Sequence, residues 1–146
     1  MSLKIKNEEV KYLAELLYSL TLKGKKSRWR TKLFDLLAHH YNVNVTPQLN
    51  QLAKDYAELD DNNELVYMNK EKSRVKVYDE YYEEANILLN EEFIIECNEL
   101  NKIMILTNAR ILLDGEFDVS PSIASMYDKW CEKFEVAIDY YEGLED

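Results

Sequence analysis

The residues that could bind a metal or act as nucleophiles are few in this chain. His39 and His40 are its only histidines, and as neighbours on a helix they would point about 100° apart, too far to chelate one metal together. Cys97 and Cys131 lack the paired spacing of a zinc site, and neither has a basic residue directly beside it. We therefore predict no metal site and interpret both histidines as part of a partly exposed helix end.

The carboxylates are numerous but do not form a recognisable catalytic group. Glu83-Glu84 and Glu91-Glu92 lie in acidic runs typical of solvated surfaces, whereas acid–base catalysis needs a carboxyl group in a closed pocket. The sequence has no G-x-S-x-G motif, and its three glycines are too few for a phosphate-binding loop. We predict that the protein is not an enzyme and uses no cofactor.

The strongest charge feature is a basic segment over residues 22–33, which we call the basic elbow. It contains six of the 18 basic residues, and no acidic residue lies between Glu15 and Asp35. Its cations could contact phosphates and Trp29 could stack on a base, but the net charge of −10 would repel a nucleic acid. We therefore expect the elbow to contact protein. The six cations are Lys23, Lys25, Lys26, Arg28, Arg30 and Lys32.

Negative charge is concentrated in the second half of the chain. Residues 1–78 carry 14 basic and 10 acidic residues, whereas residues 79–146 carry 4 basic and 18 acidic residues. This asymmetry permits contact between the basic elbow and the acidic half, within one chain or between copies. A solvated acidic face is the alternative for most of these carboxylates. The acidic contact residues that we predict are Asp79, Glu80, Glu83, Glu84, Glu91 and Glu92.

Length and composition predict one mainly helical domain over residues 1–146. A chain of this size buries about 68–70% of its unfolded surface, and 47% of its residues are apolar. Three glycines and two prolines are few for an all-β fold. The N-terminus does not resemble a signal peptide, and no apolar run is long enough for a membrane span. Cys97 and Cys131 fit a reducing cytosol as buried free thiols rather than a disulfide.

Apolar residues at helical spacing predict about five helices in a compact domain, beginning with a long antiparallel helical hairpin. We expect the first helix at about 8–21, capped by Asn7, and the second to begin after a cap at Ser27. The apolar phase of the second helix continues past residue 56, which favours one long helix. Against this, Pro47 follows an asparagine-rich, β-branched stretch, so we expect a break or sharp kink at 42–46, with the helix resuming at Pro47.

One small β-hairpin is predicted at about 65–78, where two β-rich runs flank a polar turn. A two-stranded hairpin is marginal alone, so we expect it to pack on the helices. A helix over about 80–90 follows, and residues 93–95 form a brief strand or a buried connector.

Two further helices complete the predicted fold. Asn98 caps the first, which stops at Asp114-Gly115 and whose inner face comprises Leu100, Ile103, Met104, Thr107 and Ile111. The last begins at Ser120-Pro121 and ends at Gly143. Its predicted inner face comprises Ile123, Tyr127, Trp130, Phe134, Ala137, Ile138 and Tyr141.

Four blocks of the sequence, over roughly residues 10–135, resemble a family of small proteins. The blocks are residues 22–33 (LKGKKSRWRTKL), 55–58 (DYAE), 90–95 (NEEFII) and 127–135 (YDKWCEKFE). The family is encoded by phages and prophages of low-GC Gram-positive bacteria and is classed as a domain of unknown function (DUF1617). This sequence departs from it at residues 42–47, where such proteins read as a charged, uninterrupted helix. The resemblance implies a phage product made in the bacterial cytoplasm, and no enzyme chemistry.

Together these observations predict a non-enzymatic protein-interaction module, acting in virion (tail) morphogenesis or as an accessory late-gene factor. We expect a phage or host protein partner, or a homo-oligomer, with no role for nucleic acid or membrane. The expected location is the cytoplasm of the bacterial host, with association to the virion as a further expectation. The alternative is an acidic host-takeover effector that mimics nucleic acid and binds a host nucleic-acid enzyme.

Overall fold

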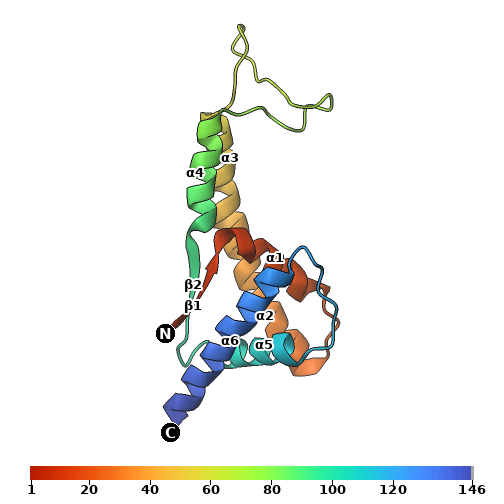
Figure 1. The fold of residues 1–146 in the computed structure, drawn as a ribbon, viewed down its shortest axis with the longest axis vertical. Helices are drawn as coiled ribbons and strands as arrows, with labels where there is room; N and C mark the ends of the chain where they lie inside the picture. The colour runs from red at the N-terminus through yellow and green to blue at the C-terminus, as the bar shows by residue number, and fades with distance from the viewer. Residues whose placement is uncertain (146) are drawn as a thin grey trace.

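The computed structural model describes residues 1–145, with the side chains of residues 1–144, and is mainly helical (Figure 1). The elements in chain order are β1 (Ser2–Lys6), α1 (Asn7–Ser19), α2 (Gly24–His40), the π-helical segment η1 (Tyr41–Val45), α3 (Thr46–Asp55), α4 (Asp79–Asn90), β2 (Glu92–Glu96), α5 (Lys102–Asp114) and α6 (Ala124–Glu145). Because α2, η1 and α3 form one continuous helix, the predicted fold class with five helices is confirmed.

The long helix does not break at residues 42–46, so of the predicted break or sharp kink the break is wrong, and the π-helical segment η1 interrupts the regular α-helix at this place. The backbone keeps right-handed helical angles from His40 through Thr46, and the N–H of Thr46 bonds to the carbonyl of Tyr41, five residues earlier. Pro47 has no N–H and its ring would collide with the carbonyl of Val43 in a regular α-helix. A π-helical turn widens the helix at this position and accommodates the proline without ending the helix.

The regular β-structure of the protein joins two segments far apart in sequence. β1 pairs antiparallel with β2, with Leu3 opposite Ile95 and Ile5 opposite Phe93. These four side chains point to the core, whereas the alternate residues of both strands face outward. The prediction of a strand at residues 93–95 is confirmed, but β1 was not predicted.

The hydrophobic core lies between the inner face of this sheet and helices α1, α2, α5 and α6. The largest fully buried side chains are Trp130, Tyr141 and Phe134, all on α6. The apolar stripe predicted for the last helix therefore does face the core. The hydroxyl of Tyr141 donates to the carbonyl of Asn98 over 2.7 Å, which fixes the start of the α5 region against α6.

The predicted inner face of α5 is correct at Met104 and Ile111, which are buried, and wrong at Leu100 and Ile103. The helix begins at Lys102 rather than after Asn98, and the side chain of Asn98 instead accepts a hydrogen bond from the N–H of Asn101. Leu100 is therefore 88% exposed before the helix and Ile103 is 49% exposed. The buried face comprises Met104, Ile105, Asn108, Ala109, Ile111 and Leu112.

The two glycines predicted to end helices behave differently. Gly115 follows the last residue of α5, and a Cβ there would lie 2.4 Å from the carbonyl oxygen of Ile111, so the close turn requires glycine. Gly143 has no neighbour within 4 Å of a built Cβ and α6 continues past it, so that predicted end was wrong. The predicted start at Ser120-Pro121 was also early: these residues form a turn, and α6 begins at Ala124.

Helices α3 and α4 lie side by side and project from the core as a two-helix arm (Figure 1). Residues 56–78, which we call the tip, connect them at the far end. No residue from 46 to 84 is buried, and none belongs to the core cluster. The arm thus extends the protein without enlarging its core.

Candidate interaction surfaces

The basic elbow lies at the turn between α1 and α2. Gly24 has φ of 59°, the positive value predicted for this position, although it begins α2 rather than simply ending α1. The predicted cap at Ser27 was wrong, because α2 begins three residues earlier. Five of the six cations of the elbow have exposed side chains and are available to a partner. They are Lys23, Lys25, Lys26, Arg28 and Lys32.

Arg30 has a different role from the other cations of the elbow. It is half-buried, and its Nη1 donates to the carbonyl oxygens of Leu17 over 2.8 Å and Leu20 over 2.5 Å. These carbonyls end α1, where a helix leaves its last acceptors unpaired and attracts positive charge. Arg30 therefore fastens α2 to the end of α1 and is not free to contact a partner. The prediction that assigned it to the contact surface is corrected accordingly.

Trp29 lies at the border between the elbow and the core. It is half-buried and packs against the core cluster, while Lys32 Nζ lies 5.0 Å and Arg28 Cζ 5.8 Å from its ring centroid. Its backbone carbonyl accepts a hydrogen bond from Nδ2 of the fully buried Asn108 over 3.1 Å. The first turns of α2 are thus held firmly on α5, and the cations project from a rigid support.

The six predicted acidic residues are all exposed and lie on or beside α4. Two of them, Glu84 and Glu91, border a shallow groove of about 270 Å³ along the arm. Ile87 is 60% exposed between them and lines the same groove together with Leu52 and Leu88. We call this the arm groove; it combines an apolar floor with a negatively charged rim. Gln48 and Gln51 of α3 complete its lining.

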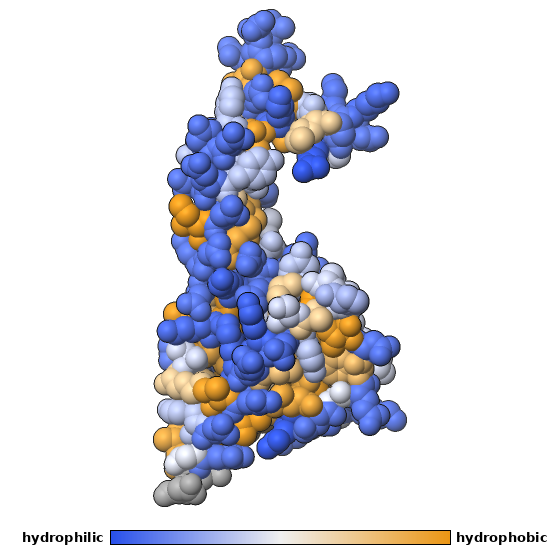
Figure 2. All heavy atoms as spheres, viewed as in Figure 1, coloured by the Kyte–Doolittle hydropathy of each residue, from blue (hydrophilic) through white to orange (hydrophobic). Residues whose placement is uncertain are grey.

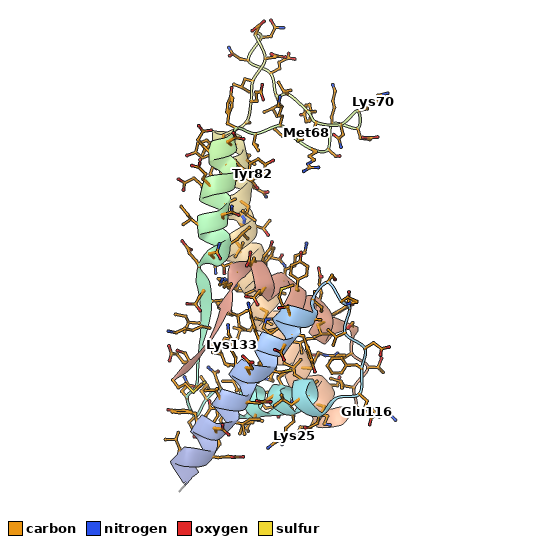
Figure 3. All side chains as sticks on the ribbon, in the orientation of Figure 1. Lys25, Met68, Lys70, Tyr82, Glu116 and Lys133 are labelled. Carbon is orange, nitrogen blue, oxygen red and sulfur yellow. The ribbon has the colours of Figure 1, made fainter. Side chains whose placement is uncertain are left out.

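The basic elbow and the acidic segment are far apart in the folded chain. Figure 3 places Lys25 beside α5 in the body, whereas Tyr82 lies high on the arm. Within residues 1–145, none of the elbow cations and none of the six predicted acidic residues forms an ion pair. Of the two contacts that the sequence left open, the one within a single chain is therefore not formed by these described residues.

The tip is an additional surface that the sequence prediction described only as a hairpin leaning on helices. Pairing of Tyr67 with Val75 gives the predicted hairpin at 65–78, without regular strands. A third segment joins it: the N–H of Glu58 bonds to Lys76 O over 2.9 Å, and the N–H of Val66 bonds to Glu58 O over 3.1 Å. The three segments support one another at the end of the arm, so the expectation that the hairpin would lean on the helical body was wrong.

Apolar side chains remain exposed along this projection. Figure 2 shows apolar surface on the arm and at its tip, in addition to patches on the body. The exposed fractions are 48% for Leu59, 44% for Leu65 and 54% for Met68. Contiguous exposed apolar patches larger than a few hundred Å² are rare on monomeric proteins and mark binding sites, whereas apolar side chains exposed singly are common. The sequence did contain a sign of this exposed surface. The β-rich runs within residues 65–78 carry apolar side chains that need to be covered, and the rest of the described chain does not cover them.

A buried polar contact joins the arm to the body. Asn7, predicted as a helix cap, makes no such cap; its Nδ2 donates to Leu88 O over 2.9 Å, so its Oδ1 faces His40. His40 Nε2 donates to that oxygen over 2.7 Å, and the ring stacks on Phe93 with centroids 4.0 Å apart. Burial, and secondly His39, lower the pKa of His40 below its ordinary value. His40 is thus a structural joint beside η1, not part of an exposed helix end.

The other titratable groups with a shifted pKa are two cysteines and two tyrosines, and in each the shift favours the neutral form. Burial is the main cause that raises the pKa of the Cys97 and Cys131 thiols, and it raises the pKa of Tyr127 and Tyr141 to about 12. Both cysteines are free thiols, as predicted. A neutral thiol is a poor nucleophile and a poor metal ligand. Across the described residues, no group of three or more His, Cys, Asp or Glu side chains could hold a metal ion.

Comparison with protein-family models, with curated proteins and with solved structures finds no match to this chain. The resemblance to the phage family therefore stays a prediction from the four sequence blocks. In the part of the chain that the structure describes, no helix combines the length and apolar character needed to cross a lipid bilayer.

Proposed function

We propose that this protein is a non-enzymatic protein-interaction module, made by a phage or prophage in the bacterial cytoplasm. It would act in virion (tail) morphogenesis or as an accessory late-gene factor, with its arm and basic elbow as contact surfaces. The phage context comes from the resemblance of the four sequence blocks. The contact surfaces come from the geometry of the arm and the elbow.

The observation that carries the proposal is the projecting arm. Residues 46–84 contribute no buried side chain, yet the tip has an ordered pattern of hydrogen bonds. Asp60 Oδ1 accepts from the N–H of Asn62 over 2.8 Å and Asn69 Oδ1 accepts from the N–H of Ser73 over 3.1 Å, which shapes the two turns. The tip is therefore ordered by its own hydrogen bonds without contributing to the core, and its exposed apolar side chains favour a role in binding.

The proposal is tested by presenting the immobilised protein to a lysate of host cells in which the phage is induced. A tip variant carries Leu59→Ser, Leu65→Ser and Met68→Ser, and a control carries Leu100→Ser, which changes an 88% exposed side chain outside the arm. We expect mass spectrometry to find a virion protein retained by the unchanged chain and the control, and lost with the tip variant. Equal retention by all three, or no retained phage protein, would refute the proposal.

The exposed acidic segment favours a second candidate function, an acidic effector that presents carboxylates as phosphate mimics. Its specific support is that Asp79, Glu80 and the other four acidic residues are exposed and have no ionic partner within the described chain. In the same experiment, retention of a host polymerase or nuclease would support this candidate. That retention should be lost on neutralising Glu83 and Glu84 but not on changing the tip.

A further inference from the structure

We propose that the protein associates with itself head to tail, the basic elbow of one copy docking in the arm groove of the next. This inference rests on the proposed interaction module and names one partner for it, a second copy of the chain. It depends on three observations: matched spacing, complementary chemistry, and the separation of the two surfaces in the fold.

The spacing of the side chains on the two surfaces is the same. On α2, Lys25, Arg28 and Lys32 lie at positions i, i+3 and i+7, and all three are exposed. On the acidic surface, Glu84 lies in α4 and Glu91, at position i+7, is the capping residue directly after the last residue of the helix, Asn90. Seven residues of helix span about 10.5 Å, and residues at this spacing share one face. Two antiparallel helices could therefore place Lys25 against Glu91 and Lys32 against Glu84.

The centre of each surface is also complementary. Ile87 lies at i+3 between Glu84 and Glu91, and it is 60% exposed on the floor of the groove. With Lys25 against Glu91 and Lys32 against Glu84, Arg28 falls opposite Leu88, one residue from Ile87, and its long aliphatic stem can reach across to cover Ile87 while the guanidinium group remains at the rim. The pairing thus covers Ile87 and gives both carboxylates a cation, which neither has within the described chain.

The fold requires this contact to form between copies. The elbow lies beside α5, whereas the groove lies on the arm formed by α3 and α4 (Figure 1). Because the elbow and the groove are different surfaces, each copy keeps one unused surface after pairing. Such a heterologous contact produces a ring or an open chain rather than a closed two-fold dimer.

The net charge of −10 opposes association but does not prevent this contact. At about 0.15 M ionic strength the Debye length is about 8 Å, so repulsion between distant charges of two copies is screened. Paired charges within about 4 Å are screened much less. We therefore expect association to be strongest near this ionic strength and to weaken at about 1 M salt.

The test uses two variants that each remove one surface. The elbow variant carries Lys25→Gln, Arg28→Gln and Lys32→Gln, and the groove variant carries Glu84→Gln and Glu91→Gln. All five side chains are exposed, and Arg30 is left unchanged, so folding is expected to be preserved and is checked by circular dichroism. A control variant neutralises two exposed carboxylates on α6, Glu135→Gln and Asp139→Asn.

Sedimentation velocity then measures the mass of the protein species as a function of protein concentration, up to about 0.1 mM. Association with a micromolar dissociation constant is readily detected in this range. We expect the unchanged protein and the control to form species larger than a dimer, and each surface variant to remain monomeric. An equimolar mixture of the two variants should form 1:1 dimers and nothing larger, because only one complementary pair of surfaces remains.

Three results would overturn the inference. The first is an unchanged protein that stays monomeric over this range, which would leave the groove to a basic helix of another protein. The second is a mixture of the two variants that stays monomeric, and the third is a single surface variant that still associates alone. Neither result affects the tip variant, so loss of a virion partner on changing the tip would still support the proposed module.

Discussion

Arg28 and Arg30 are two residues apart in sequence, but the structure predicts very different consequences when each is replaced by methionine. Arg30 donates to the carbonyls of Leu17 and Leu20 at the end of α1, whereas Arg28 is exposed and has Trp29 as its aromatic neighbour. Methionine retains much of the apolar stem and removes the guanidinium group. The pair therefore separates a structural arginine from one available for contact.

The size of the difference follows from the contacts that are lost. A hydrogen bond from a charged group contributes about 1.5–3 kcal/mol, and a cation at a helix C-terminus about 0.3–1 kcal/mol. Because Arg30 is only half-buried and water can replace part of these contacts, we expect Arg30→Met to cost about 2–3 kcal/mol. Arg28→Met, like most surface substitutions, should stay within about 0.5 kcal/mol.

Urea unfolding followed by circular dichroism measures both free energies of unfolding, provided that the slopes of the transitions agree. In thermal unfolding, the loss at Arg30 should lower the Tm by roughly 4–12 °C. Equal free energies for the two variants, within about 0.5 kcal/mol, would refute the structural assignment of Arg30.

Two further predictions concern a turn and the joint of the arm. Gly115→Ala should destabilise the protein by about 1–3 kcal/mol in urea unfolding, because the added Cβ would lie 2.4 Å from Ile111 O; an unchanged midpoint would contradict this. The lowered pKa of His40 means that the unfolded chain binds its proton more readily, so stability should fall as pH falls from about 7 through the ordinary pKa of about 6.5 to the folded value. His40→Gln keeps a donor to Asn7 and should reduce this pH dependence; an identical dependence in both proteins would count against the assignment.

The sequence predicts most of the helices in the body of the fold, because apolar residues that recur at helical spacing over several turns identify a helix and its buried face unambiguously. The α6 stripe through Trp130, Phe134 and Tyr141 continues for several turns, so an error of three residues at its start does not change the face that is buried. The α5 prediction was wrong at Leu100 and Ile103 because Leu100 extends the apolar spacing beyond the start of the helix. Leu100 is exposed because it lies in the turn that precedes Lys102, and the spacing of apolar residues does not reveal this turn.

The remaining differences depend on distant partners or on backbone geometry. β1 is five residues long, and its partner β2 lies about ninety residues later, so local pattern alone could not identify the pair. Pro47 predicted a break because a regular helix cannot accept it, but a π-helical turn can. For the candidate surfaces, the charge of the residues correctly indicated that most of their side chains would be exposed. The inward role of Arg30, in contrast, depends on where α1 ends in the folded protein.

The account depends most on the claim that the arm serves binding rather than the stability of the core. The N–H of Tyr78 bonds to Tyr56 O over 2.8 Å, so a short glycine-serine linker can replace residues 57–77 without moving either helix. We predict that urea unfolding of this variant gives a free energy within about 1 kcal/mol of the unchanged protein, because no buried side chain is removed. A loss above about 3 kcal/mol, or loss of the cooperative transition, would contradict the central claim.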